Sequence, residues 1–362
     1  MYINEFKSRQ LELVAEHRIV LRKKPHLRWL FFEIINKCNL RCSHCGSSCL
    51  SDGQQLSVDD IRRTLITIND DKPMVCVTGG EPLLHPDFFG IIDQINKMGF
   101  KWGMTTNGTL IDEKKAEDLA RAQIATVSVS LDGMEESHDK LRGYKGAWEL
   151  AVRGLSSLIK VGIEPQVTTV CHRGNIEDIE ELYELINSMG ITSWRVINVE
   201  PIGRACESDG MMLDEKQFRW LLSFIRSKRF DNTCDMEVTY GCSHYLGLEN
   251  ERMVRDHYFL CGAGLLTASV RSNGDICACL DIENRPELVQ GNIKNDNFLD
   301  VWSNKFKEFR YDRTEYSSKC RNCTERLYCG GDSYHTWDYE KMEPKLCYKD
   351  FMFGGSENHI SV

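Results

Sequence analysis

The chain has 362 residues, of which 41% are hydrophobic and 27% are charged, and its formal net charge at pH 7 is −9. A chain of this length is expected to form one large domain and a smaller one, and its acidic balance argues against a nucleic-acid partner. It has no apolar run near the ~20 residues of a membrane helix and no signal-peptide pattern at its polar start, so we expect a cytoplasmic protein without a membrane partner.

Between residues 31 and 201, predicted strands alternate with predicted helices. Short runs rich in β-branched and aromatic residues predict strands at 31–35, 74–78, 101–106, 126–131, 164–170 and 193–199. Apolar residues at helical spacing predict helices at 58–69, 87–98, 112–122, 147–161, 176–189 and 214–229. The alternation implies an α/β fold with a parallel sheet, either a partial, TIM-like (β/α)6 barrel or a doubly wound sheet. In both folds the ligand site lies at the carboxyl ends of the strands.

Beyond the barrel the alternation stops and Cys becomes dense. We therefore expect four parts: an N-terminal extension at 1–30, the barrel at 31–230, a connecting segment at 231–260 and a small Cys-rich domain at 261–362. In the Cys-rich domain, a hairpin over 267–271 and 275–279 is predicted to turn at Asn273-Gly274. Aromatic residues at helical spacing predict an amphipathic helix over 297–309, whose aromatic stripe is interpreted as core.

Three cysteines, Cys38, Cys42 and Cys45, follow the first predicted strand directly. The chain has 16 Cys, and closely spaced Cys in a reducing compartment indicate metal binding rather than disulfides. Iron–sulfur clusters are normally held by four Cys ligands. A compact group of three therefore suggests a cubane cluster with one iron left open for another ligand. Cys76 and Cys171 lie inside predicted strands and are interpreted as buried core thiols.

Short polar motifs recur where other predicted strands end. They are Gly79-Gly80-Glu81-Pro82, Thr106-Asn107-Gly108, Ser130 with Asp132-Gly133, and Arg142. Two Gly allow the backbone to approach a ligand closely, Glu81 suits an ammonium group, and Arg142 suits a carboxylate. With small hydroxyls for a ribose, these groups describe a site for an amino-acid nucleoside whose amine and carboxylate chelate the open iron.

The Cys triplet and the strand-end motifs together resemble the radical S-adenosylmethionine (SAM) superfamily over residues 31 to about 200. The resemblance implies a six-unit partial barrel with a [4Fe-4S] cluster on the loop after the first strand. The residues that it assigns to SAM binding are Gly79, Gly80, Glu81, Pro82, Thr106, Asn107, Ser130, Asp132 and Arg142. In this family the cluster gives one electron to SAM, which yields methionine and a 5′-deoxyadenosyl radical that abstracts a hydrogen atom from the substrate.

A second set of cysteines, Cys320, Cys323, Cys329 and Cys347, lies near the C-terminus. By spacing alone, this set fits structural zinc and an iron–sulfur cluster equally well. Its surroundings resemble the SPASM extension of radical SAM enzymes, which usually carries two auxiliary [4Fe-4S] clusters. The resemblance assigns these four thiols to one of the two clusters.

The other auxiliary cluster of that family is matched only in part. Cys261 and Cys279 stand at its positions, whereas Ser333 replaces the next Cys. Candidates for the remaining ligand are Cys277, Asp332, Ser333 and His335. We therefore expect this site to hold a cluster with an unusual ligand, a cluster with an open iron, or no cluster.

SPASM enzymes mostly modify peptides or proteins. The resemblance thus implies an enzyme that acts on a ribosomally made precursor peptide and installs a thioether, a carbon–carbon bond or an epimerised centre. It also implies a flavodoxin- or ferredoxin-type electron donor. Because only 30 residues precede the first strand, a separate leader-binding protein, a groove between the domains or a sheet edge is expected to hold the leader. Glu200 and Asp281 are the candidate acid/base residues.

Two other functions stay open. Within the same chemistry, the alternative is oxidation of Cys or Ser to formylglycine, as in sulfatase maturation. That group has an Asp directly after the Cys matched by Cys279, whereas Leu280 follows here and Asp281 is one residue further on. The alternative of another class is a zinc-stabilised, non-enzymatic binding protein on an α/β platform.

Overall fold

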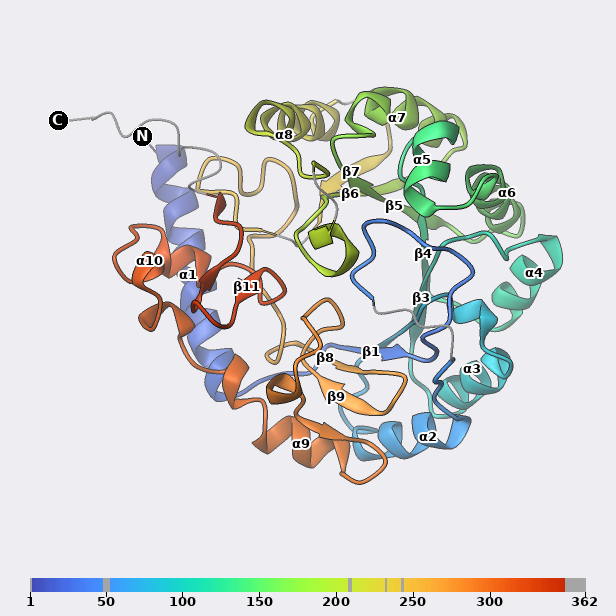
Figure 1. Ribbon diagram of the computed structural model, residues 1–362, viewed down its shortest axis with the longest axis horizontal. Helices are drawn as coiled ribbons and strands as arrows, with labels where there is room; N and C mark the ends of the chain where they lie inside the picture. The colour runs from blue at the N-terminus through green and yellow to red at the C-terminus, as the bar shows by residue number, and fades with distance from the viewer. Residues whose placement is uncertain (1, 48–52, 208–209, 232, 242–243, 349–362) are drawn as a thin grey trace.

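A ten-stranded sheet organises the molecule, as seen in a computed structural model that describes residues 2–47, 53–207, 210–231, 233–241 and 244–348 (Figure 1). Seven of its strands follow one another in parallel: β1 (Trp29–Glu33), β2 (Met74–Thr78), β3 (Trp102–Thr106), β4 (Thr126–Ser130), β5 (Pro165–Cys171), β6 (Ser193–Asn198) and β7 (Glu237–Tyr240). The first six were predicted to within two residues at each end. The strands curve into an open barrel with helices outside it, which confirms the α/β fold (Figure 1).

The predicted helices lie between these strands. They are α2 (Val58–Thr67), α3 (Phe88–Lys97), α4 (Glu113–Arg121), α6 (Ala147–Lys160), α7 (Ile179–Ser188) and α8 (Glu215–Arg229). Local chemistry fixes their ends: Ser57 and Asp60 form a capping box at the start of α2. Gly99, which follows the C-cap residue Met98 of α3, has a φ of 73°, a conformation that Gly adopts without strain. A further helix, α5 (Glu135–Arg142), was not predicted, because its sequence is almost entirely polar.

The two faces of the barrel sheet differ, since successive side chains of a strand point to opposite sides. On β6, Trp194 faces the outer helices and packs against Tyr183 of α7 and Phe224 of α8. Its neighbour Arg195 therefore faces the barrel interior, which we call the lumen. Cys76 is also only partly buried, at a lumen-facing position of β2, which corrects its interpretation as a core thiol.

The Cys-rich domain continues the same sheet. Its strand β8 (Thr267–Val270) pairs in parallel with β1, and β9 (Asp275–Cys277) and β10 (Gly291–Asn292) follow in antiparallel order. The predicted hairpin is thus confirmed. The predicted helix over 297–309 is shorter, because α9 (Phe298–Asn304) gives way to a 3₁₀ turn at Lys307–Phe309. The remaining elements are α10 (Ser318–Arg321), α11 (Arg326–Cys329), β11 (Trp337–Asp338), β12 (Glu343–Pro344) and 3₁₀ turns at Pro82–Leu84, Ile176–Asp178, Gly203–Glu207, Pro286–Leu288 and Arg313–Glu315.

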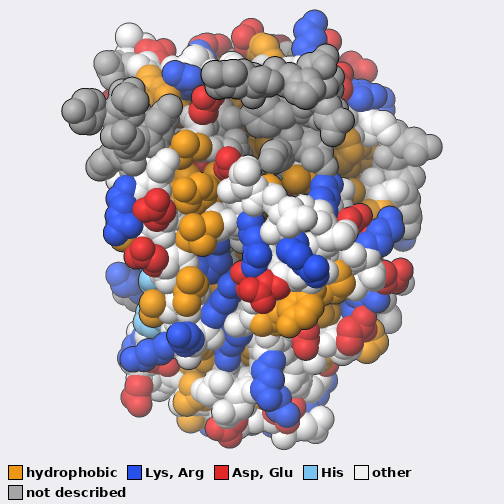
Figure 2. Space-filling model, turned by 90° about the vertical axis from the view of Figure 1, so that its left-hand side faces the viewer, with side chains coloured by type: hydrophobic (Ala, Val, Ile, Leu, Met, Phe, Trp, Pro, Cys, Tyr) orange, Lys and Arg blue, Asp and Glu red, His pale blue; other side chains and the backbone are white. Residues whose placement is uncertain are grey.

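The N-terminal extension forms a long helix, α1 (Tyr2–Lys23), which lies beside α10 and away from the barrel helices α3 to α7 (Figure 1) and contacts α11. Leu11 of this helix is fully buried among Tyr245, Tyr258 and Phe259. On the described part of the molecular face that carries α1 and α10, side chains of both charges are interspersed (Figure 2). Across the described ranges, no helix is both long and apolar enough to cross a membrane.

Candidate functional site

The loop after β1 brings three thiols together, as the sequence predicts. Cys38, Cys42 and Cys45 form a small cluster with Leu40 and Ala147, in which Cys42 is buried and the other two thiols are partly exposed. The backbone N–H of Leu40 donates to Cys38 Sγ over 3.4 Å. The loop thus presents its sulfurs as one group at the carboxyl end of β1.

The glycine pair after β2 packs closely against the backbone of this loop. A Cβ atom on Gly79 would lie 2.4 Å from the carbonyl oxygen of Ile35, and one on Gly80 would lie 2.3 Å from that of Lys37. The backbone N–H groups of Gly80 and Glu81 donate to these same two oxygens over 2.7 and 2.9 Å. Only glycine permits so close an approach, so the pair holds the cysteine loop in place. SAM binding by Gly79 and Gly80 stays a prediction.

Glu81 is fully buried and joins the ends of β2 and β3. Its carboxylate accepts from Thr106 Oγ1 at 2.8 Å and from the backbone N–H groups of Asn107 at 2.9 Å and Leu83 at 3.2 Å. Burial raises the pKa of Glu81 to about 7, against the effect of these donors. The adjacent Pro82 is also buried and begins a 3₁₀ turn. A bound ammonium group would therefore meet a carboxylate that is already positioned.

Asn107 links β3 to the cysteine loop. Its Nδ2 donates to Asn39 Oδ1 at 2.9 Å and lies 4.0 Å from Cys38 Sγ, while its Oδ1 accepts from Thr109. Ser130 at the end of β4 is partly exposed, and its hydroxyl bonds none of the residues that the structure describes. Of the predicted hydroxyl groups, Ser130 is thus the one open to a ligand.

Arg142 is committed to the protein itself. Its Nε and Nη2 atoms lie 2.6 and 2.5 Å from Asp132 Oδ2, and its Nη1 lies 3.7 Å from Cys42 Sγ. The second oxygen of Asp132 accepts from the backbone N–H of Val170 on β5. Burial alone would raise the pKa of Asp132, but the guanidinium outweighs it and holds this pKa below its usual value. A ligand carboxylate, the predicted partner of Arg142, would have to share the guanidinium with Asp132.

These contacts suit a thiolate-bound cluster. Side-chain N–H groups of Asn107 and Arg142 point at Cys38 and Cys42, and hydrogen bonds to sulfur are among the levers by which proteins tune such clusters. Among the described residues, no three His, Cys, Asp or Glu side chains are gathered around one metal-ion position. A cubane does not need that arrangement, because each thiolate binds its own iron. The triplet therefore fits three ligands of a [4Fe-4S] cluster.

Glu200, a predicted acid/base residue, lies at the end of β6 in a buried network of charges. His244 Nε2 lies 3.0 Å from Glu200 Oε1, and His335 Nε2 lies 2.6 Å from Oε2. The other ring nitrogen of His244 is 2.8 Å from Asp332, which also accepts from the backbone N–H of Tyr245. The two Nε2 contacts lack hydrogen-bond alignment, so they act chiefly as ion pairs. The network ties the barrel mouth to the Cys-rich domain.

Charge pairing outweighs burial throughout this network. Burial disfavours ionised Glu200, but His335 and His244 hold its pKa well below the usual range. Burial likewise disfavours protonated His244, but Asp332 and Glu200 raise its pKa to about 10. The pKa of His335 is raised for the same reason, chiefly by Glu200. His244 lies in the segment predicted to be a connection, where a single His gives no pattern that would reveal it.

The C-terminal cysteines lie near one another in smaller sets. Cys320 lies near Cys323, and Cys329 lies near Cys347; all four are partly buried. Cys279 lies near Cys261 and Cys277, and Cys261 packs in the same apolar cluster as Cys329. Asp281 is exposed and accepts from Cys279 Sγ over 3.8 Å, so the structure places this predicted acid/base residue beside a thiol. Ser333 is fully buried.

The close approach at Gly80 generates a prediction. Gly80→Ala would force a Cβ atom against the carbonyl of Lys37 and displace the cysteine loop, so purified protein should lose the iron held by the triplet. Gly162→Ala is the control: it has no neighbour within 4 Å but a φ of 80°, so it should cost about 1 kcal/mol of stability and keep its iron. Iron per chain and thermal unfolding check both variants. Equal iron in Gly80→Ala and wild type would contradict the assignment.

The charge network predicts a loss of stability at alkaline pH. His244 has a folded pKa of about 10 and an unfolded pKa near 6.5, so the folded protein binds the extra proton between these values. Its stabilising effect is complete below pH ~6.5 and should fall by about 1.4 kcal/mol per pH unit as the pH rises toward 10. Melting temperatures should therefore fall less steeply with rising pH in His244→Asn than in the wild type. Equal slopes in wild type and His244→Asn would refute the role of His244.

Comparisons with known proteins agree with this site. Residues 32–186 match the Radical SAM superfamily, and residues 261–324 match SPASM, an iron-sulfur cluster-binding domain. An AdoMet-dependent heme synthase of Nitratidesulfovibrio vulgaris is 27% identical over 90% of this chain and 93% of its own. The mycofactocin maturase MftC of Mycolicibacterium smegmatis is 28% identical over 83% and 76%. Streptococcus suis SuiB, solved with its precursor peptide SuiA, shares the fold with a TM-score of 0.72 at 21% identity, over 86% of this chain and 72% of that one.

The domain matches cover both the loop with the thiol triplet and much of the Cys-rich domain. They favour iron–sulfur chemistry over a zinc-stabilised scaffold. The chain is thus an enzyme of the radical SAM superfamily with a SPASM domain, and its cofactors are SAM, the [4Fe-4S] cluster that binds SAM, and one or two auxiliary iron–sulfur clusters.

Proposed function

We propose that this enzyme abstracts a hydrogen atom from a ribosomally made peptide in the lumen and installs a thioether, a carbon–carbon bond or an epimerised centre. The likeness to mycofactocin maturase supports a peptide substrate, and the shared fold with SuiB, solved with a precursor peptide, supports it further. When bound, the cluster and SAM supply the radical that takes the hydrogen atom. Recognition of the leader by a separate protein and electron supply by a flavodoxin or ferredoxin belong to this proposal.

A row of polar side chains across the lumen supports the proposal. Ser130, Thr168, Arg195 and Thr239 are paired in register on β4, β5, β6 and β7. Residues paired in this way share one face of a sheet, and Trp194 shows that the other face is the one covered by helices. The row therefore lies on the lumen side, at the level of a residue predicted to bind SAM.

Arg195 provides the positive charge of this row. Its Nη2 donates to Thr168 Oγ1 at 3.1 Å, and that hydroxyl is 2.7 Å from Ser128 Oγ. Its Nε is buried without a partner, and among the described residues no carboxylate lies within ion-pair distance of it. Burial raises the pKa of Cys76 on β2 to about 12, and the positive charge of Arg195 opposes this shift.

An arginine in this position suits a substrate carboxylate. The guanidinium presents a rigid fork of donors that matches a carboxylate in two parallel hydrogen bonds. A peptide would supply this group as an Asp or Glu side chain or as its C-terminus. Arg195 faces the lumen and has no acidic partner within the described ranges, and this observation carries the proposal.

A tetrapyrrole is the second candidate substrate. The heme synthase relative aligns with 90% of this chain, a larger share than the maturase does. Porphyrins carry propionate groups, whose carboxylates would suit Arg195 equally well. Formylglycine formation has less support, because Asp281, its nearest candidate base, is exposed and does not directly follow Cys279.

The cysteine sets should have separable roles. Anaerobically purified protein should be brown and should cleave SAM with dithionite, and Cys42→Ala should abolish this cleavage while keeping the fold, because it removes a ligand of the SAM-binding cluster. Cys329→Ala should spare cleavage and abolish substrate turnover. Chromatography of 5′-deoxyadenosine and circular dichroism check these outcomes. Normal cleavage by Cys42→Ala would contradict the assignment of the triplet.

Substrate class and the role of Arg195 can be tested together. Short peptides that contain Asp, matched peptides that contain Asn, and hemin should be incubated with holoenzyme, SAM and dithionite. We expect product only from peptides, with the Asp peptides preferred. Arg195→Met should raise KM for the Asp peptides about tenfold and remove the preference, since a charged hydrogen bond is worth about 1.5 kcal/mol.

Arg195→Lys is the matched variant, which should keep part of the preference because it keeps the charge. Mass spectrometry of peptides and porphyrin gives the readout. Turnover of hemin alone would replace the peptide proposal with the tetrapyrrole one. An unchanged preference for Asp in Arg195→Met would leave the peptide proposal standing and refute the role of Arg195.

A further inference from the structure

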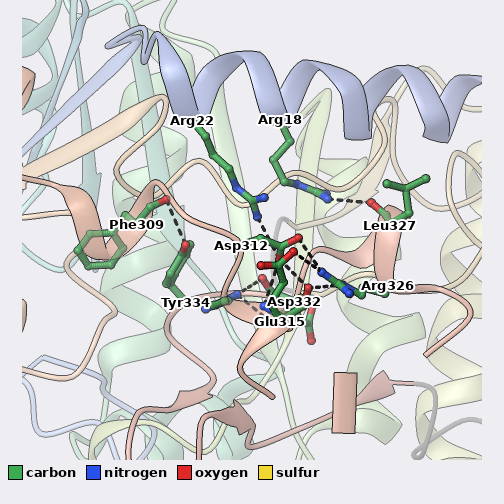
Figure 3. Close-up of polar contacts among 12 residues, drawn as sticks. Arg18, Arg22, Phe309, Asp312, Glu315, Arg326, Leu327, Asp332 and Tyr334 are labelled. Atoms are coloured by element: carbon green, nitrogen blue, oxygen red, sulfur yellow. Dashed lines mark hydrogen bonds and ion pairs between the residues drawn. The ribbon is translucent and has the colours of Figure 1, made fainter. Parts of the chain in front are cut away.

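Arg18, in the N-terminal helix α1, is a buried cation. Its side chain is 7% exposed and reaches from α1 to the Cys-rich domain (Figure 3). Its Nη1 donates to the carbonyl oxygen of Leu327 at 3.0 Å, and its Nη2 donates to that of Tyr328 at 2.8 Å. The contacts are to neutral backbone groups, so they satisfy the donors without balancing the charge.

The neighbouring arginines differ from Arg18 in this respect. Arg22, one turn further along α1, lies 3.6 Å from Asp312. Arg326 lies 3.3 Å from Asp312 and 3.1 Å from Glu315 (Figure 3). Among the described residues, no carboxylate comes within 4.0 Å of the guanidinium of Arg18. Of these three arginines, the most buried one is thus the one that lacks an acidic partner.

The surroundings of Arg18 are thiols. The carbonyl of Tyr328, to which it donates, belongs to the peptide group that precedes Cys329. Arg18 and Cys323 line the same cavity of about 340 Å³ between α1 and α11. One turn before Arg18, Val14 packs into the same apolar cluster as Cys261 and Cys329. The helix therefore covers the cysteine sets of the SPASM domain directly.

A buried charge is costly unless an opposite charge accompanies it. A [4Fe-4S] cluster with four thiolate ligands has a net negative charge, which becomes more negative on reduction. Net charge and hydrogen bonding near a cluster set its reduction potential. The negative charge that Arg18 lacks among the described residues is thus available from a cluster held by Cys320, Cys323, Cys329 and Cys347.

We propose that Arg18 is the counter-ion of this auxiliary cluster and raises its reduction potential. The positive charge favours the reduced, more negative state of the cluster. This gives α1, a helix outside both matched domains, a role in electron transfer. The inference rests on the assignment of the SPASM cluster and is independent of the substrate.

The test is an anaerobic redox titration of the holoenzyme, followed by electron paramagnetic resonance of the auxiliary cluster. Arg18→Gln keeps a donor and much of the volume but loses the charge, so its midpoint potential should shift to more negative values. Each tenfold weakening of the reduced state corresponds to about 59 mV for a one-electron couple. Arg18→Lys should stay near the wild-type potential. A purely structural role, through the carbonyls of α11, would instead shift both variants alike.

Two further variants sharpen the test. Arg9→Gln is the matched control on the same helix and should leave the potential unchanged, because Arg9 is exposed, pairs with Glu12 and does not line the cavity. Asp312→Asn should shift the potential in the positive direction, because it releases the charges of Arg22 and Arg326 near the same cavity. This opposite shift keeps the proposal testable if Arg18→Gln fails to fold. An unchanged potential in Arg18→Gln, or in Asp312→Asn should the former not fold, would overturn the proposal.

Discussion

The buried ion pair between Asp132 and Arg142 is the interaction on which the site depends most. It joins the end of β4 to α5, and Arg142 then reaches Cys42 in the loop after β1. Asp132 also accepts from the backbone of β5, so a single carboxylate fixes three strand ends relative to one another. Removal of one partner from a buried pair leaves an uncompensated charge, at a cost of about 3–5 kcal/mol. The thiol triplet is therefore held by the barrel and not by its own loop alone.

Much of the barrel could be predicted from the sequence, because the alternation of apolar strands and amphipathic helices is a local pattern. The polar helix α5, the N-terminal helix α1 and the short strand β7 lack such a pattern and were missed. Two of the predicted strand-end residues, Asn107 and Arg142, lie beside the thiol triplet, and their binding of SAM stays a prediction. Their contacts within the protein were not predictable: the sequence does not reveal the ion pair between Arg142 and Asp132, because sequence spacing gives position and not orientation.

The contacts at the junction between the barrel and the SPASM domain could not be predicted from the sequence either. Asp332 and His335 were considered as cluster ligands in place of the Cys that Ser333 replaces. The structure engages Asp332 with His244 and His335 with Glu200, across a sequence separation that no local pattern spans. Ion pairs join these four groups across the junction, so the charge network helps to hold the two domains together.

The pairing of β8 with β1 has a consequence for how the chain folds. Trp29 lies beside Thr267, so β1 obtains its second neighbour only after most of the polypeptide has been made. Such long-range parallel contacts form slowly, since the entropy of closing the loop is lost before the contact compensates for it. Until then, the strand that carries the cysteine loop has one open edge, and open edges invite pairing with other chains. During ribosomal synthesis, this edge of β1 would thus stay exposed until β8 has been made. The SPASM hairpin then covers the edge of the barrel, in addition to carrying cysteines for metal binding.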